Sequence, residues 1–197
     1  MIQSLESLHR AAQERGSRVL AVAAAQDPEV LLAVDAARKL GIATAILVGD
    51  EDQIRAIAQA HNIPLEPHRI LPEPDKIQAC RTAVKLVRDG QADAVMKGIV
   101  DTSIILKAVL DRDIGLRDAP VLSHVALFQV PGYDRLLYVT DAAMNIAPDV
   151  EAKKHIVSNA VKVAHALGNP NPIVGLPVRR ERGQPQNARN PGRRRPW

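Results

Sequence analysis

The residues best placed to do chemistry follow a short apolar run that ends at Met96. Lys97 and Gly98 come next, and Asp101 or Thr102 is suited to cap the helix that follows. A helix N-terminus presents unpaired N–H groups and roughly half a positive charge, and the lysine adds a full charge at the end of the strand. This order of residues predicts an anion site with phosphate as its ligand. The plainer interpretation is a solvated lysine in a loop.

A second informative segment runs from residue 120 to residue 148. Residues 121–130 form an apolar run of high β-propensity, Pro131 and Gly132 interrupt it, and residues 136–140 return to a strand pattern. We therefore expect an antiparallel hairpin here.

Three polar residues of this segment are candidates for a site. Ser123 and His124 are neighbours in a predicted strand, so their side chains point to opposite faces and they are not expected to act as a nucleophile and its base. Asp141 follows a strand, where an aspartate serves either as a turn former or as a site residue. Both interpretations of Asp141 stay open.

These residues depend on elements that alternate between helix and strand patterns. Such alternation specifies an α/β fold with a mainly parallel sheet, helices on both faces and ligands at the carboxyl ends of the strands. Lys97 lies at such an end. A first helix is predicted to begin near Leu5, and further helices are predicted over residues 28–40, 51–60, 75–88, 103–110 and 148–167. Strands are predicted over residues 18–24, 44–48, 69–71 and 92–96, over the two hairpin segments, and over residues 171–174.

Charge divides the chain into two parts. Residues 175–197 hold seven arginines and one acidic residue, a formal charge of +6, whereas residues 1–174 carry −2. The sequence pI of about 9.5 therefore reflects the tail and does not indicate that the whole domain binds nucleic acid. With four prolines and few apolar residues the tail is expected to be disordered, and its composition also fits an out-of-frame reading of a GC-rich gene. A genuine basic tail for RNA or lipid is the alternative.

The remaining composition limits the class of protein. The single cysteine, Cys80, allows no internal disulfide and stands among apolar residues at helical spacing, which predicts a buried, inert thiol in a reducing cytoplasm. The sequence has no run of eighteen apolar residues and no cluster with metal-ligand spacing, so we expect neither a membrane span nor a metal.

Several ordered motifs resemble the phosphate acetyl/butyryl transferase family, and its butyryltransferase branch more than its acetyltransferase branch. They are Met-Lys-Gly at 96–98 with Thr102, Leu-Ser-His-Val-Ala at 122–126, and Tyr-Val-Thr-Asp-Ala-Ala-Met-Asn-Ile-Ala-Pro at 138–148. The helix that begins at Glu151 also fits. The resemblance covers residues 3–174, and the sequence departs from the family pattern after Val174.

The resemblance implies a fold of the isocitrate/isopropylmalate dehydrogenase type, incomplete at the C-terminus, with residues 1–174 as the N-terminal part of the transferase domain. It implies transfer of a short acyl group, butyryl or similar, between coenzyme A and inorganic phosphate. Coenzyme A is then a substrate, and no cofactor is expected. The family's catalytic residues are expected beyond the end of this chain. The substrate-binding residues implied here are Lys97, Gly98, Thr102, Ser123, Asp141 and Asn145.

Further expectations follow from the same resemblance. Arg112 and Arg117 flank a loop and are candidates for contact with a coenzyme A phosphate. The complete protein is expected to be a cytoplasmic homo-oligomer that binds neither membrane nor nucleic acid. Two alternative functions remain: a phosphate acetyltransferase, and a non-catalytic anion-binding or partner-binding module with a basic tail.

Overall fold

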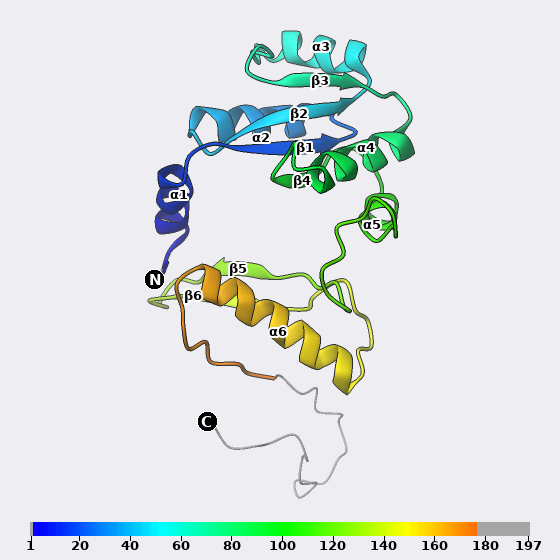
Figure 1. Ribbon diagram of the computed structural model, residues 1–197. Coiled ribbons are helices and arrows are strands. Elements are labelled where there is room, and N and C mark those ends of the chain that lie inside the picture. The colour runs from blue at the N-terminus through cyan, green and yellow to red at the C-terminus, as the bar shows by residue number, and fades with distance from the viewer. Residues whose placement is uncertain (1, 177–197) are drawn as a thin grey trace, which may run out of the picture.

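A computed structural model describes residues 2–176 and contains two sheets (Figure 1). One is a four-stranded parallel sheet with the order β3-β2-β1-β4, and the other is the antiparallel hairpin β5-β6. The expected fold class is thereby confirmed. The elements are α1 (Leu5–Glu14), β1 (Arg18–Ala23), α2 (Pro28–Lys39), β2 (Ala43–Gly49), α3 (Glu51–Ala60), β3 (Arg69–Pro72), α4 (Lys76–Arg88), β4 (Ala94–Lys97), α5 (Thr102–Val109), β5 (Ala126–Gln129), β6 (Leu136–Val139) and α6 (Val150–Ala166).

Residues 18–116, called the sheet unit below, bury a core on each face of the parallel sheet. Successive side chains of β1 alternate between the faces: Ala21 and Ala23 pack with α4 and α5, whereas Val22 packs with α2 and α3. Both faces are covered, so the central strands are apolar throughout, as parallel strands generally are. Cys80 is fully buried in the first core, which confirms the expected buried thiol.

Residues 120–174, called the hairpin unit below, form a second layer in which α6 lies along β5 and β6 (Figure 1). Gly132 turns the hairpin with a φ of +86°, a conformation that favours glycine, as the Pro-Gly pair predicts. The N-terminus joins this unit to the rest of the chain, because the Leu5 N–H donates to Gln129 Oε1 at 2.9 Å and the Ile2 N–H donates to the Leu167 carbonyl at 3.0 Å.

The first hairpin strand is shorter than expected, because residues 121–125 are not part of the ladder. Three of their carbonyl groups accept hydrogen bonds from side chains instead. Asn159 Nδ2 donates to the Val121 carbonyl at 2.9 Å, Asn145 Nδ2 donates to the Leu122 carbonyl at 3.0 Å, and Thr140 Oγ1 donates to the His124 carbonyl at 2.7 Å. Backbone groups that are already paired in this way have no need of a neighbouring strand.

The prediction of a strand over residues 171–174 is wrong, since the structure has no helix or strand there. Pro170 and Pro172 supply no N–H donors, Ile173 is 91% exposed, and no neighbouring strand pairs with this segment in the described residues. Most of the tail predicted to be disordered, residues 177–197, lies outside the described residues. No helix within residues 2–176 is long and apolar enough to cross a membrane.

Candidate functional site

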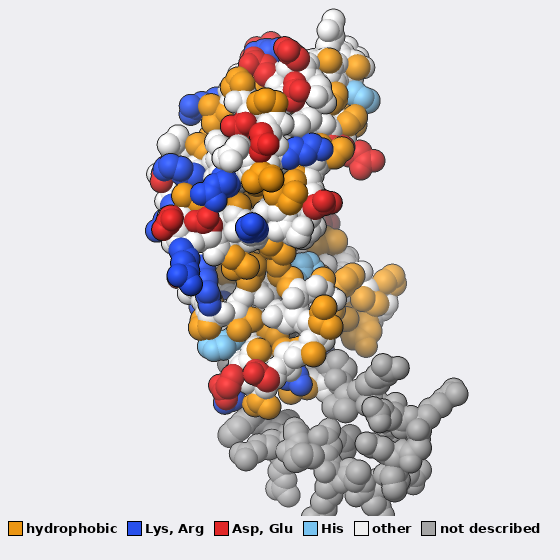
Figure 2. Space-filling view, turned by 90° about the vertical axis from the view of Figure 1, so that its right-hand side faces the viewer, with side chains coloured by type: hydrophobic (Ala, Val, Ile, Leu, Met, Phe, Trp, Pro, Cys, Tyr) orange, Lys and Arg blue, Asp and Glu red, His pale blue; other side chains and the backbone are white. Residues whose placement is uncertain are grey.

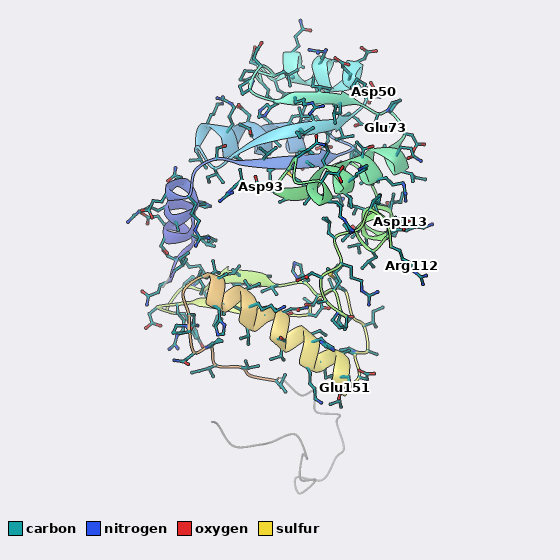
Figure 3. All side chains as sticks on the ribbon, in the orientation of Figure 1. Asp50, Glu73, Asp93, Arg112, Asp113 and Glu151 are labelled. Atoms are coloured by element: carbon teal, nitrogen blue, oxygen red, sulfur yellow. The ribbon has the colours of Figure 1, made fainter. Side chains whose placement is uncertain are left out.

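The candidate site begins at the carboxyl ends of β1 and β4, which are neighbours in the parallel sheet. After β1 the chain adds β2 and β3 on one side of β1, and it then returns to add β4 on the other side of β1. The carboxyl ends of β1 and β4 therefore form the topological switch point, where ligands of such sheets bind. Figure 3 shows Asp50 and Glu73 at the same carboxyl edge and Asp93 at the opposite edge.

Gly98 brings the chain after β4 very close to the end of β1. Its N–H donates to the Ala23 carbonyl at 2.8 Å, and a Cβ at this position would lie 2.1 Å from the carbonyl oxygen of Ala24. The carbonyl oxygens of Ala23 and Ala24 that obstruct a Cβ belong to the backbone and cannot rotate away. Glycine is therefore required here because two chain segments approach each other closely.

Lys97 is the last residue of β4, and its side chain folds over the loop that leads into α5. Lys97 Nζ donates to the Val100 carbonyl at 2.9 Å and to the Gly98 carbonyl at 3.3 Å. An ammonium group has three donors, so one remains for a ligand. The loop geometry therefore holds the positive charge beside the first turn of α5.

The N-terminus of α5 differs from the other helix starts in residues 2–176. Each of the other five helices has an N-cap side chain that accepts a hydrogen bond from its first turn, whereas Asp101 makes no such bond at α5. Of the two expected cap residues, Asp101 and Thr102, Asp101 occupies the N-cap position but makes no capping hydrogen bond, and Thr102 is the first residue of the helix. The first turn of α5 thus has no side-chain cap, although the Ile104 N–H donates to the Asp101 carbonyl at 3.0 Å.

A cleft of about 740 Å³ opens at this edge and is lined by Lys97, Gly98, Asp101 and the starts of α2 and α4. Lys76 adds a second positive charge that the sequence interpretation missed. Its signal was its position at the start of α4, the helix after β3, since every strand-to-helix connection of a parallel sheet reaches the same edge. Asp27, Glu29 and Asp101 also line the cleft, so its lining holds three carboxylates and two lysines. Within this lining, the positive charge of Lys97 and the N-terminus of α5 are the features that favour an anion.

Thr102 and Asn145 lie on the other side of α5, in a second cavity of about 460 Å³ between α5 and the hairpin unit. Arg117 also lines this cavity and donates to the carbonyl groups of Ala119 and Pro120. The structure thus divides the predicted site residues between two adjoining spaces. Ser123 and Asp141 belong to the lining of neither.

Asp141 organises the turn that follows β6. Its Oδ1 accepts hydrogen bonds from the N–H groups of His124 at 3.3 Å and Met144 at 3.1 Å, and its carboxylate also pairs with the Asn145 side chain. Burial raises the pKa of Asp141, but the hydrogen bonds from Asn145 and from the backbone outweigh it and hold the pKa below its ordinary value. Asp141 is therefore an ionised turn former, and its part in substrate binding stays a prediction.

Ser123 contacts α6 rather than a cavity, because its Oγ accepts a hydrogen bond from Asn159 Nδ2 at 2.9 Å. The hydroxyl proton of Ser123 remains available to donate. Figure 3 shows Arg112 at the outer side of the α5 end, directed away from the sheet. Among the described residues, no three histidine, cysteine, aspartate or glutamate side chains are grouped to hold a metal ion.

Fold and site together define an α/β protein with a candidate anion site at the switch point of a parallel sheet. The chain belongs to the phosphate acetyl/butaryl transferase family, whose model matches residues 71–186. It is 45% identical over 174 residues to a phosphate butyryltransferase of Clostridium acetobutylicum, covering 88% of this chain and 58% of that protein. A phosphate acetyltransferase of Rhizobium meliloti is 36% identical over 171 residues, covering 81% of this chain and 54% of that protein.

Solved structures give the same result. A branched-chain phosphotransacylase from Enterococcus faecalis V583 superposes with a TM-score of 0.64 at 30% identity, covering 77% of this chain and 52% of that one. A phosphotransacetylase from Streptococcus pyogenes superposes with a TM-score of 0.66 at 17% identity, over 84% of this chain and 60% of that one, which shows the shared fold alone. The chain thus spans 52% to 60% of the length of these four proteins.

Proposed function

We propose that the protein transfers an acyl group between coenzyme A and inorganic phosphate, with butyryl or a similar short chain as the acyl group. The observation that carries the proposal is the 45% identity over 174 residues to a phosphate butyryltransferase, against 36% to a phosphate acetyltransferase. Acetyl transfer is the second candidate, and the acyl-chain preference discriminates between the two.

The cleft beside Lys97 is the proposed phosphate site. A phosphate there receives one donor from Lys97 Nζ and further donors from the uncapped first turn of α5. Gly98 lets this loop lie against β1, so that the lysine and the helix start are held on the rigid sheet. Thr102 and Asn145 bind the substrate in the second cavity.

In the forward reaction a phosphate oxygen attacks the thioester carbonyl carbon, and the tetrahedral intermediate then collapses. The carbon–sulfur bond breaks, the acyl phosphate forms, and the coenzyme A thiolate leaves and takes up a proton. The reaction needs a group that handles this proton and donors for the oxyanion of the intermediate. We place these groups outside residues 1–174, because the described residues supply chiefly the neutralisation of phosphate.

The same proposal covers the remaining properties of the protein. Acyl-coenzyme A and phosphate are its substrates, and it needs no cofactor. Residues 1–174 form part of the transferase domain, and residues 175–197 are a basic segment. The protein acts in the cytoplasm as a homo-oligomer.

A chimera tests this function directly. Residues 1–174 are joined to the part of the Clostridium acetobutylicum relative that follows its matched region, and the release of thiol from butyryl-coenzyme A is measured with and without phosphate. We expect phosphate-dependent release from the chimera and none from the 197-residue chain. A folded chimera without turnover would contradict the proposed function, and turnover by the 197-residue chain would contradict the division at residue 174.

A further inference from the structure

The second cavity, between α5 and the hairpin unit, has a largely apolar wall. Leu106 and Leu110 line it from α5, and Leu122 and Met144 line it from the hairpin unit. Two of its polar side chains are already engaged, because Asn145 donates to the Leu122 carbonyl and Arg117 donates to the Ala119 and Pro120 carbonyls. Thr102, at the start of α5, adds one hydroxyl group to the lining. A cavity of this kind favours an aliphatic guest, because a polar one would lose hydrogen bonds to water without replacement.

Helix α5 joins this cavity to the phosphate cleft. Asp101 and Ile104 face the cleft, whereas Thr102, Leu106 and Leu110 face the cavity. These last three residues are spaced four apart, so each lies about 6 Å further along one side of the helix. A group held at the start of α5 can therefore extend an attached chain past Thr102 and along the two leucines.

We propose that the second cavity binds the acyl chain of the thioester, and that Leu106 and Leu110 set the accepted chain length. This inference rests on the proposed function, because a thioester carbonyl attacked by phosphate at the start of α5 carries its chain into this space. Leu106 would contact the end of a four-carbon chain, and Leu110 closes the space beyond it.

Binding of coenzyme A, acetyl-coenzyme A, butyryl-coenzyme A and hexanoyl-coenzyme A to the 197-residue chain tests the inference by titration calorimetry. Each buried methylene strengthens binding by up to about fourfold, so butyryl-coenzyme A is expected to bind up to about 15-fold more tightly than acetyl-coenzyme A. In Leu106→Phe and Leu110→Phe this preference is expected to fall toward unity, while binding of coenzyme A itself stays the same.

Leu32→Phe is the matched control, because Leu32 and Leu110 are equally exposed at 45% and Leu32 does not line the cavity. Leu110 is exposed enough for Leu110→Phe to preserve the fold. Leu110→Phe therefore still tests the inference if Leu106→Phe fails to fold. The inference is overturned if the unaltered chain shows no preference between acetyl-coenzyme A and butyryl-coenzyme A, or if both cavity variants keep it. Loss of turnover in the chimera with this preference intact would instead count against the proposed function alone.

Discussion

The sheet unit and the hairpin unit differ most in how they bury apolar side chains. Val22, Leu47 and Val84 of the sheet unit are fully buried, whereas in the hairpin unit only Leu136, Ile156 and Ala164 are buried among the described hydrophobic residues. The hairpin unit also exposes large apolar side chains: Leu122, Phe128, Tyr133, Val139, Ile146, Val150, Ile173 and Val174. Figure 2 shows charged side chains of both signs across the sheet unit and several hydrophobic patches on the surface below it.

This difference assigns separate roles to the two units. The sheet unit holds Lys97 and the start of α5 on a packed frame, which suits a site that needs fixed geometry. The hairpin unit contributes an apolar wall to the second cavity and leaves further apolar surface uncovered. Surface of this extent is typical of regions that contact another chain or domain.

The strongest test of the comparison removes one leucine from each unit. Leu47→Ala in β2 should lower the free energy of unfolding by about 4 kcal/mol, because it leaves a cavity in a fully buried core. Leu137→Ala in β6 should cost about 1 kcal/mol, because that side chain is only partly buried. Urea unfolding of both variants measures the difference. Equal losses would show that the hairpin unit is packed as tightly as the sheet unit.

Removing the charge of Lys97 tests the role of the sheet unit in phosphate binding. Lys97→Met in the chimera should lower kcat/KM for phosphate by about 10- to 150-fold, because a charge-assisted hydrogen bond contributes about 1.5 to 3 kcal/mol. The KM for butyryl-coenzyme A should stay unchanged. Lys107→Met, also on the α5 segment but outside both cavities, is the control. Unchanged phosphate kinetics in Lys97→Met would remove this residue from the site.

A smaller effect is expected at the boundary between the two units. Thr102→Val keeps the shape of the side chain and removes one neutral hydroxyl, so kcat/KM should fall by about fivefold, equivalent to about 1 kcal/mol. Ser103→Ala, its exposed neighbour outside both cavities, should leave kcat/KM unchanged. If the two variants behave alike, Thr102 has no contact with the substrate.

The smallest effect concerns the ion pair between Arg81 of α4 and Asp111, which follows α5. The Arg81 guanidinium, 2.7 Å from the Asp111 carboxylate, together with the N–H groups of Asp113 and Ile114, lowers the pKa of Asp111 to about 2. A lowered pKa stabilises the folded state above the ordinary value of 3.8, and this contribution is lost as the pH falls toward 2. The difference in Tm between the unaltered chain and Asp111→Asn should therefore be larger at pH 5 than at pH 2.5.

Asp113→Asn provides the control for that titration, because Asp113 forms no ion pair with any described residue. Its Tm difference should be small at both pH values. A Tm difference for Asp111→Asn that stays constant between pH 5 and pH 2.5 would show that the ion pair with Arg81 does not contribute to folding.

Local patterns explain why much of the sheet unit could be predicted from the sequence. Lys97, Gly98 and Asp101 are close in sequence, so a strand, a turn and a helix start were enough to place them at one edge. Lys76 was missed because its nearness to Lys97 depends on the order of the strands. Residues 121–125 looked like strand because their carbonyl partners, Asn159 among them, lie far away in the sequence.

Phosphate binding at the start of α5 is the central claim, and amide NMR shifts of the 197-residue chain during a titration with inorganic phosphate test it most directly. Saturable shifts are predicted for the amides of residues 98–103, with none at the amino edge near Asp93, and Lys97→Met should weaken the binding at least tenfold. Shifts that do not saturate, or that are the same in Lys97→Met, would contradict a phosphate site at this position.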